Sequence, residues 1–174
     1  MLASFINQVL LGDNLAILQQ LPSNAIDMVY LDPPFGSSRH YHATHPNGEV
    51  RTFSDVWEHL DDYLSWLHPR VLELHRIMKP TATFYLHCDW HANAYIRVQI
   101  LDVIFGRKNF RNELIWHYET GGIPKRDFAR KHDTIFRYTK TNDYYFDAQS
   151  IRESRSEEVL RRLATGIESA TRAR

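Results

Sequence analysis

Two strand-length apolar runs on either side of one long amphipathic stripe constrain the fold more than any other feature of the chain. The first run, Ile26–Leu31, is apolar except at Asp27, and the second, Thr81–Asp89, is rich in threonine and aromatic residues. Both have the length of buried strands. Between them, apolar residues recur every three or four positions from Trp57 to Met78, which predicts a helix. Strand, helix, strand is the repeating unit of a doubly wound α/β sheet.

The rest of the chain is predicted to extend this alternation. Phe5–Leu11 reads as an additional strand, and residues 91–106 as an amphipathic helix that ends at Gly106. Asn112–Glu119 and Asp133–Lys140 have strand-like composition, and the long loop between them suits an antiparallel pair. We therefore predict an α/β fold with a partial doubly wound, mostly parallel sheet and a terminal antiparallel strand.

Local signals predict the structure of the segments between these elements. Asn14 is positioned to cap a short helix, and residues 39–53 are polar enough to read as a long irregular loop. Ser54 is predicted to be the N-cap of the long helix, and Pro69 is expected to kink or split that helix.

Composition narrows the class of protein. The chain has 174 residues, enough for one domain with a substantial core. Cys88 is the single cysteine, which excludes a disulfide framework or a cysteine zinc cluster within one chain and suits a reducing cytoplasm. The amino-terminal segment is too short and too interrupted to span a membrane. We therefore expect a cytoplasmic protein with no membrane partner.

Charge is distributed unevenly, although the formal net charge is zero. Residues 121–140 hold six Lys or Arg against two Asp, so the loop between the last two predicted strands is basic. Such a loop can hold nucleic-acid phosphates, and a solvated surface is the alternative. The candidate DNA-binding cations in this loop are Lys125, Arg126, Arg130 and Lys131.

A carboxylate, two prolines and an aromatic ring directly follow the first apolar run, as Asp32, Pro33, Pro34 and Phe35. In open α/β sheets, ligands bind beyond the carboxyl ends of the strands, where these residues are predicted to lie. The prolines fix two φ angles and remove two N–H donors, so the turn offers hydrogen-bond acceptors beside a flat ring. A rigid turn with no further role is the alternative.

These groups suit a nucleobase that carries an exocyclic amine. The Asp32 carboxylate and the Pro33 carbonyl can accept the two amine hydrogens, which turns the nitrogen lone pair toward an electrophilic methyl group. Both acceptors bind more strongly as positive charge develops on the nitrogen. Phe35 can stack on a base that has been taken out of the duplex.

Four segments together resemble a known family. They are LGDNLAILQQLPSNAIDMVYLDPPF, IMKPTATFYLHCD, NFRNELIWHYETGG and KHDTIFRYTK. They resemble amino-methylating DNA methyltransferases, and more closely the bacterial site-specific adenine-N6 enzymes of the permuted (beta) order, over about residues 9–165. The resemblance implies that Asp32 to Phe35 are the catalytic motif, that the target is the adenine N6 amine of double-stranded DNA, and that S-adenosylmethionine is the methyl donor. An acid at the first motif position resembles the adenine enzymes more than the cytosine-amine enzymes.

The glycines depart from this resemblance. The family carries a Phe-x-Gly-x-Gly loop that approaches the cofactor, whereas the seven glycines of this chain form no Gly-x-Gly. We therefore expect residues 1–150 to form a partial methyltransferase catalytic domain, and residues 151–174 a helical or loose tail that leads into a missing region. The chain is then a truncated or split enzyme that a complementing chain or a homodimer completes, and no cofactor-binding residue is assigned.

Two other functions are weighed against an enzyme of this kind. One is a non-catalytic methyltransferase-like module that binds DNA or a partner chain, which the missing glycine loop favours. The other is a metal hydrolase that uses His40, His42 and His45. Their spacing within a loop does not produce convergent ligands, so no metal site is predicted.

Overall fold

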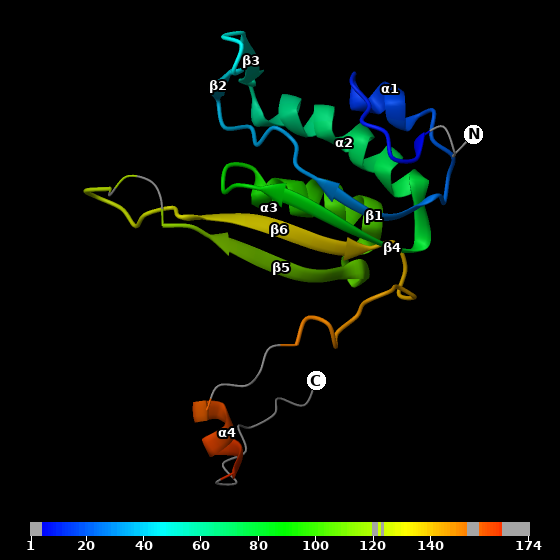
Figure 1. Ribbon diagram of the computed structural model, residues 1–174, viewed down its shortest axis with the longest axis vertical. Coiled ribbons are helices and arrows are strands. Elements are labelled where there is room, and N and C mark those ends of the chain that lie inside the picture. The colour runs from blue at the N-terminus through cyan, green and yellow to red at the C-terminus, as the bar shows by residue number, and fades with distance from the viewer. Residues whose placement is uncertain (1–4, 120–121, 123, 153–156, 165–174) are drawn as a thin grey trace.

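A single four-stranded sheet carries most of the fold (Figure 1). The computed structural model describes residues 5–119, 122, 124–152 and 157–164. The strand order is β1-β4-β6-β5. Strand β1 (Ile26–Leu31) runs parallel to β4 (Met78–Cys88), whereas β6 (His132–Thr139) is antiparallel to both β4 and β5 (Phe110–His117).

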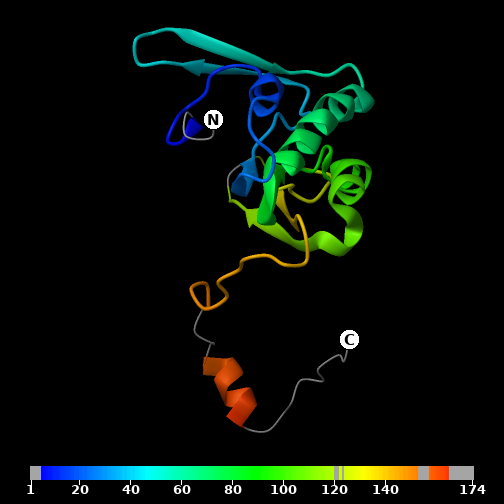
Figure 2. The ribbon, with the colours of Figure 1, turned by 90° about the vertical axis from the view of Figure 1, so that its right-hand side faces the viewer.

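Helices cover one face of this sheet (Figure 2). The short helix α3 (Asn93–Tyr95) continues as a π-helical segment, Ile96–Gly106, and a 3-10 turn, Arg107–Asn109. The long helix α2 (Leu60–Ile77) packs beside the π-helical segment. The core between helices and sheet contains fully buried side chains from α2, β4, the π-helical segment and β6. They include Tyr63, Leu67, Val71, Phe84, Leu86, Ile96, Leu101 and Tyr138.

The opposite face of the sheet carries exposed apolar side chains. Met28 and Tyr30 on β1 are 61% and 51% exposed, and Leu114 and Trp116 on β5 are also exposed. Strand β1 is therefore half exposed, and the expectation that it would be buried on both faces is wrong. It is one of the two edge strands of the described sheet, paired with β4 on one side.

The α/β class and the terminal antiparallel strand are confirmed. The sheet is mixed rather than mostly parallel, since only the β1–β4 pairing among the described strands is parallel. The helix α4 (Glu157–Ala164) lies in the predicted tail. The division of the chain at residue 150 stays a prediction. Within the described residues, the helices are too short or too polar to cross a membrane.

A β-hairpin occupies the segment that the sequence suggested was an irregular loop. Strands β2 (Arg39–Thr44) and β3 (Val50–Asp55) pair in antiparallel register. Gly48 has a φ of 84° in the turn between them, where it follows Asn47, and Asn-Gly is a strong hairpin signal. Ser54 lies in β3, so its prediction as an N-cap is wrong. The N-cap of α2 is His59.

Two other local predictions also fail, and a third fails in part. Phe5–Leu11 forms no strand, and Val9 and Leu11 are fully exposed. Helix α1 (Asn14–Leu18) is capped by Asp13, whose Oδ1 accepts hydrogen bonds from the N–H groups of residues 15 and 16. Pro69 lies inside α2 without splitting it, because the buried stripe on either side of it packs continuously against the sheet. The expected kink stays a prediction.

Candidate active site

The predicted catalytic motif leaves the carboxyl end of β1 and lines a cavity of about 360 Å³. The cavity is bordered by Asp32, Pro33, Pro34, Phe35, Tyr41 and Asp55. The motif therefore comes together with two residues of the β2–β3 hairpin that the sequence did not single out. The Asp32 side chain is 62% exposed, so its carboxylate is available to a ligand.

Asp55 organises the turn that follows the motif. Its side chain is almost fully buried, and its two oxygens accept five hydrogen bonds. Oδ2 accepts the N–H of Phe35 at 3.2 Å and both the N–H and hydroxyl of Ser37 at 2.8 and 2.6 Å. Oδ1 accepts the N–H of Gly36 and the Trp57 indole N–H, each at 3.0 Å. Burial alone raises the pKa of Asp55, but the hydrogen bonds from Ser37, Trp57 and Gly36 outweigh it and lower the pKa below its usual value.

A glycine is required at the centre of this turn. Gly36 has a φ of 71°, which L side chains rarely adopt. A Cβ atom at this position would lie 3.5 Å from the Tyr63 ring. The absence of a side chain lets the backbone turn, so that three consecutive N–H groups point at the Asp55 carboxylate.

Tyr63 of α2 fixes the second proline of the motif. Its hydroxyl donates a 2.6 Å hydrogen bond to the Pro34 carbonyl oxygen. Burial raises the pKa of Tyr63 well above its usual value, so the hydroxyl stays protonated and remains a donor. The motif is thus held from the hairpin through Asp55 and from the helical layer through Tyr63.

His87, at the end of β4, lies between two carboxylates beside the motif. Its Nδ1 is 3.7 Å from Oδ1 of Asp32 and 3.2 Å from the Tyr30 hydroxyl, and its Nε2 is 3.3 Å from Oδ2 of Asp133. The His87 ring also contacts the Phe35 ring, with centroids 5.2 Å apart. From the sequence, His87 at a strand end could line the pocket or be a satisfied polar strand terminus, and the structure places it beside Asp32.

Two of the four predicted DNA-binding cations approach the motif. Arg130 and Lys131 line a second cavity, of about 270 Å³, that also touches Ser37 and Tyr41. Lys125 and Arg126 are exposed on the same loop. The structure therefore brings Arg130 and Lys131 toward the candidate active site and leaves the other two on the surface.

The histidine-rich segment does not form a metal centre in the described part of the chain. His40 and His42 are exposed on β2. Among the residues that the structure describes, no three His, Cys, Asp or Glu side chains are grouped in a way that could hold a metal ion.

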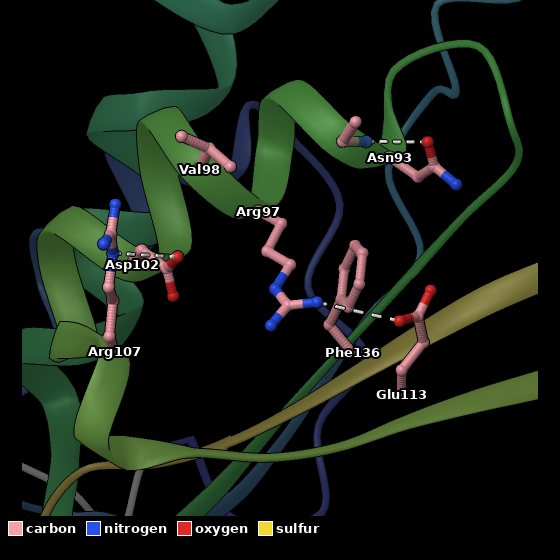
Figure 3. A pocket seen from close by; sticks show the side chains of 8 residues that line it. Asn93, Arg97, Val98, Asp102, Arg107, Glu113 and Phe136 are labelled. Atoms are coloured by element: carbon pink, nitrogen blue, oxygen red, sulfur yellow. Dashed lines mark hydrogen bonds and ion pairs between the residues drawn. The ribbon is translucent and has the colours of Figure 1, made fainter.

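A larger cavity, of about 510 Å³, lies between the π-helical segment and β5 (Figure 3). Its charged side chains pair with each other: Arg97 lies 3.7 Å from Glu113, and Arg107 lies 3.7 Å from Asp102. Asp102 also accepts a 2.7 Å hydrogen bond from the Tyr138 hydroxyl. Because its charges are matched locally, this cavity offers less to a charged ligand than the two cavities at the motif.

The fold is that of DNA methyltransferases. The chain superposes on the cytosine-N4-specific PvuII DNA methyltransferase with a TM-score of 0.56 and 18% identity, covering 94% of this chain and 64% of that one. A DNA modification methylase from Thermus thermophilus, complexed with S-adenosyl-L-methionine, gives a TM-score of 0.54 and 20% identity over 87% of this chain and 64% of that chain.

Sequence comparison identifies the family. A family model described as DNA methylase, for N6 and N4 methyltransferases, matches residues 26–165. The chain belongs to this DNA methylase family. It is 29% identical over 142 residues to the type II methyltransferase M.KpnI of Klebsiella pneumoniae, covering 78% of this chain and 33% of that protein. It is 24% identical over 144 residues to the DNA adenine methyltransferase YhdJ of Escherichia coli K12, covering 80% of this chain and 44% of that protein. The chain thus spans less than half the length of these relatives.

Proposed function

We propose that this chain carries the catalytic motif of a site-specific DNA adenine-N6 methyltransferase of the restriction–modification type, with S-adenosylmethionine as the methyl donor. The observation that carries the proposal is the cavity at the end of β1, where an exposed carboxylate and a stacking ring lie on a turn fixed by Asp55.

The residues of the motif act on the amine of a flipped adenine. The Asp32 carboxylate and the Pro33 carbonyl accept its two hydrogens, and Phe35 stacks on the ring. S-adenosylmethionine, when bound, supplies an electrophilic methyl group. The N–C bond would form as the S–C bond of the sulfonium breaks and S-adenosylhomocysteine leaves, and the nitrogen would give up one proton, with Asp32 as the proposed acceptor. Since Asp55 and Tyr63 hold the turn before substrate arrives, little reorganisation is needed at the moment of reaction.

The residues present fit the amine better than they fit the cofactor. Asp32, Pro33 and Phe35 supply acceptors and a flat ring at one cavity. The seven glycines form no Gly-x-Gly that would allow a close backbone approach to a cofactor. We therefore assign no cofactor-binding residue.

Adenine is favoured over cytosine by the acid at position 32, following the family resemblance, and by the similarity to a relative described as a DNA adenine methyltransferase. Double-stranded DNA is the proposed substrate, with Lys125, Arg126, Arg130 and Lys131 supplying charge for its phosphates. A soluble cytoplasmic protein is the corresponding expectation. The missing glycine loop favours a second candidate, a module that binds DNA or a partner chain without catalysis.

A methyl-transfer assay with product analysis tests the proposal. The purified chain is incubated with labelled S-adenosylmethionine and adenine-rich duplex, and the DNA is then digested and its nucleosides are identified by mass spectrometry. We expect N6-methyladenine with the wild type, a yield about 10²–10³-fold lower with Asp32→Ala, and an unchanged yield with Arg107→Gln, which lines the other cavity. N4-methylcytosine would overturn the adenine assignment, and DNA binding without any product would favour the binding module.

A further inference from the structure

A second cavity, of about 270 Å³, lies beside the motif. We propose that it binds the backbone phosphate next to the flipped nucleotide. The proposal rests on the proposed function. It adds a positioning site formed by Arg39, Arg130 and Lys131, which come from the β2–β3 hairpin and from the loop before β6.

The position of the cavity suits the nucleotide that the motif would hold. Tyr41 lines both this cavity and the cavity of the catalytic motif, so the two are neighbours. Ser37, one residue beyond the turn glycine, also lines it. Base flipping rotates a nucleotide about its own backbone, so a phosphate attached to a base in the first cavity lies close to the second.

Arg130 is oriented in advance by an aromatic stack. The Arg130 guanidinium carbon lies 3.9 Å from the centroid of the Trp90 ring, and the His91 ring stacks on Trp90 at 3.8 Å. Two groups at these distances cannot share one face of the indole, so Trp90 is sandwiched between them. Stacking occupies the face of the guanidinium and leaves the N–H donors in its plane for a phosphate.

The charges of the cavity favour an anion. Among the residues that the structure describes, three cations line it, against one carboxylate, that of Asp89. That carboxylate is already engaged, because it accepts the His91 backbone N–H at 2.9 Å and lies 2.6 Å from His91 Nδ1. Lys131 donates to the carbonyl of Glu119 at 3.1 Å, which is a neutral acceptor and leaves the positive charge uncancelled. The lining therefore carries an excess of positive charge, which favours a phosphodiester group over a neutral ligand.

The salt dependence of DNA binding tests this site directly. A fluorescein-labelled, adenine-rich duplex is titrated with the full chain at a series of NaCl concentrations, and log K is plotted against log [NaCl]. Loss of one phosphate contact lowers the magnitude of the slope by about 0.9. We expect this change for Arg130→Gln. Arg107→Gln is the matched control, because Arg107 is exposed at the other end of β5, and it should leave the slope unchanged.

A conservative variant separates orientation from charge. Arg130→Lys keeps the cation but loses the planar stack on Trp90, so we expect an unchanged slope with DNA affinity about two- to fivefold lower. An unchanged slope for Arg130→Gln, or an equal fall for Arg107→Gln, would overturn the phosphate site while the proposed function stands. Absence of any DNA binding by the wild type would instead refute the proposed function and the phosphate site together.

Discussion

Replacing Asp55 by asparagine should unfold the turn that presents the catalytic motif. The carboxylate accepts five hydrogen bonds, three at Oδ2 and two at Oδ1. Asparagine has one side-chain oxygen. If that oxygen takes the place of Oδ2, the three hydrogen bonds from Phe35 and Ser37 are kept. Its amide nitrogen then faces two donors, the N–H of Gly36 and the indole N–H of Trp57, which are left without an acceptor.

The cost follows from these two bonds. A hydrogen bond to a charged group contributes about 1.5–3 kcal/mol, so Asp55→Asn should lower the free energy of unfolding by about 3–6 kcal/mol. This is a large fraction of the roughly 5–15 kcal/mol that stabilises a typical domain. The substitution is nearly isosteric, so the loss reports on hydrogen bonding rather than on packing.

Urea denaturation followed by circular dichroism measures this free energy. Asp127→Asn is the matched control, since Asp127 is exposed in the loop between β5 and β6, and it should change the stability by less than about 0.5 kcal/mol. A loss below about 1 kcal/mol for Asp55→Asn would refute the reasoning, because it would mean that the N–H of Gly36 and the indole N–H of Trp57 find other partners and that the turn does not depend on this carboxylate.

The remaining predictions concern the same site. Asp32→Ala should lower the rate of methyl transfer by about 10²–10³-fold. The urea midpoint should hardly change, because the Asp32 side chain is exposed. A rate within a few-fold of wild type would remove Asp32 from the mechanism. Tyr63→Phe deletes the hydrogen bond to the Pro34 carbonyl, so it should lower the free energy of unfolding by about 1–3 kcal/mol. An equally stable variant would show that water replaces the hydroxyl. Because the pKa of Asp55 is lowered in the folded protein, its stabilising contribution is present above its unfolded pKa of about 3.9 and is lost as pH falls through the folded pKa. Wild-type stability should therefore fall more steeply than that of Asp55→Asn on acidification below about pH 4, and parallel pH profiles would contradict this.

The helix α2 and the strands β1 and β4 could be predicted from the sequence. The apolar stripe of α2 and the apolar runs of β1 and β4 have clear periods, because each packs into the core. A strand that ends in Asp-Pro-Pro-Phe can be placed at the ligand-binding edge of an α/β sheet. That is why the motif, Asp32 to Phe35, was found at a cavity where it was expected.

The residues around the catalytic motif, in the hairpin and at the end of β4, could not be predicted from the sequence. The side chains of β2 are all exposed, so its sequence shows no alternation that would mark a strand. Only the Asn47-Gly48 turn signalled the hairpin. The role of Asp55 depends on that hairpin folding back onto a turn about 20 residues earlier in the chain, and the position of His87 beside Asp32 depends on the β1–β4 register. Tertiary contacts of this kind leave no local pattern.

Calorimetric titration with S-adenosylmethionine, with and without adenine-rich duplex, tests the central proposal most directly. If the chain carries a working methyltransferase site, we predict saturable heat in the micromolar range, strengthened when DNA is present. Asp32→Ala should bind the cofactor with similar affinity, because Asp32 is assigned to the amine. The absence of heat under both conditions would contradict the enzymatic account and leave a module that binds without catalysis.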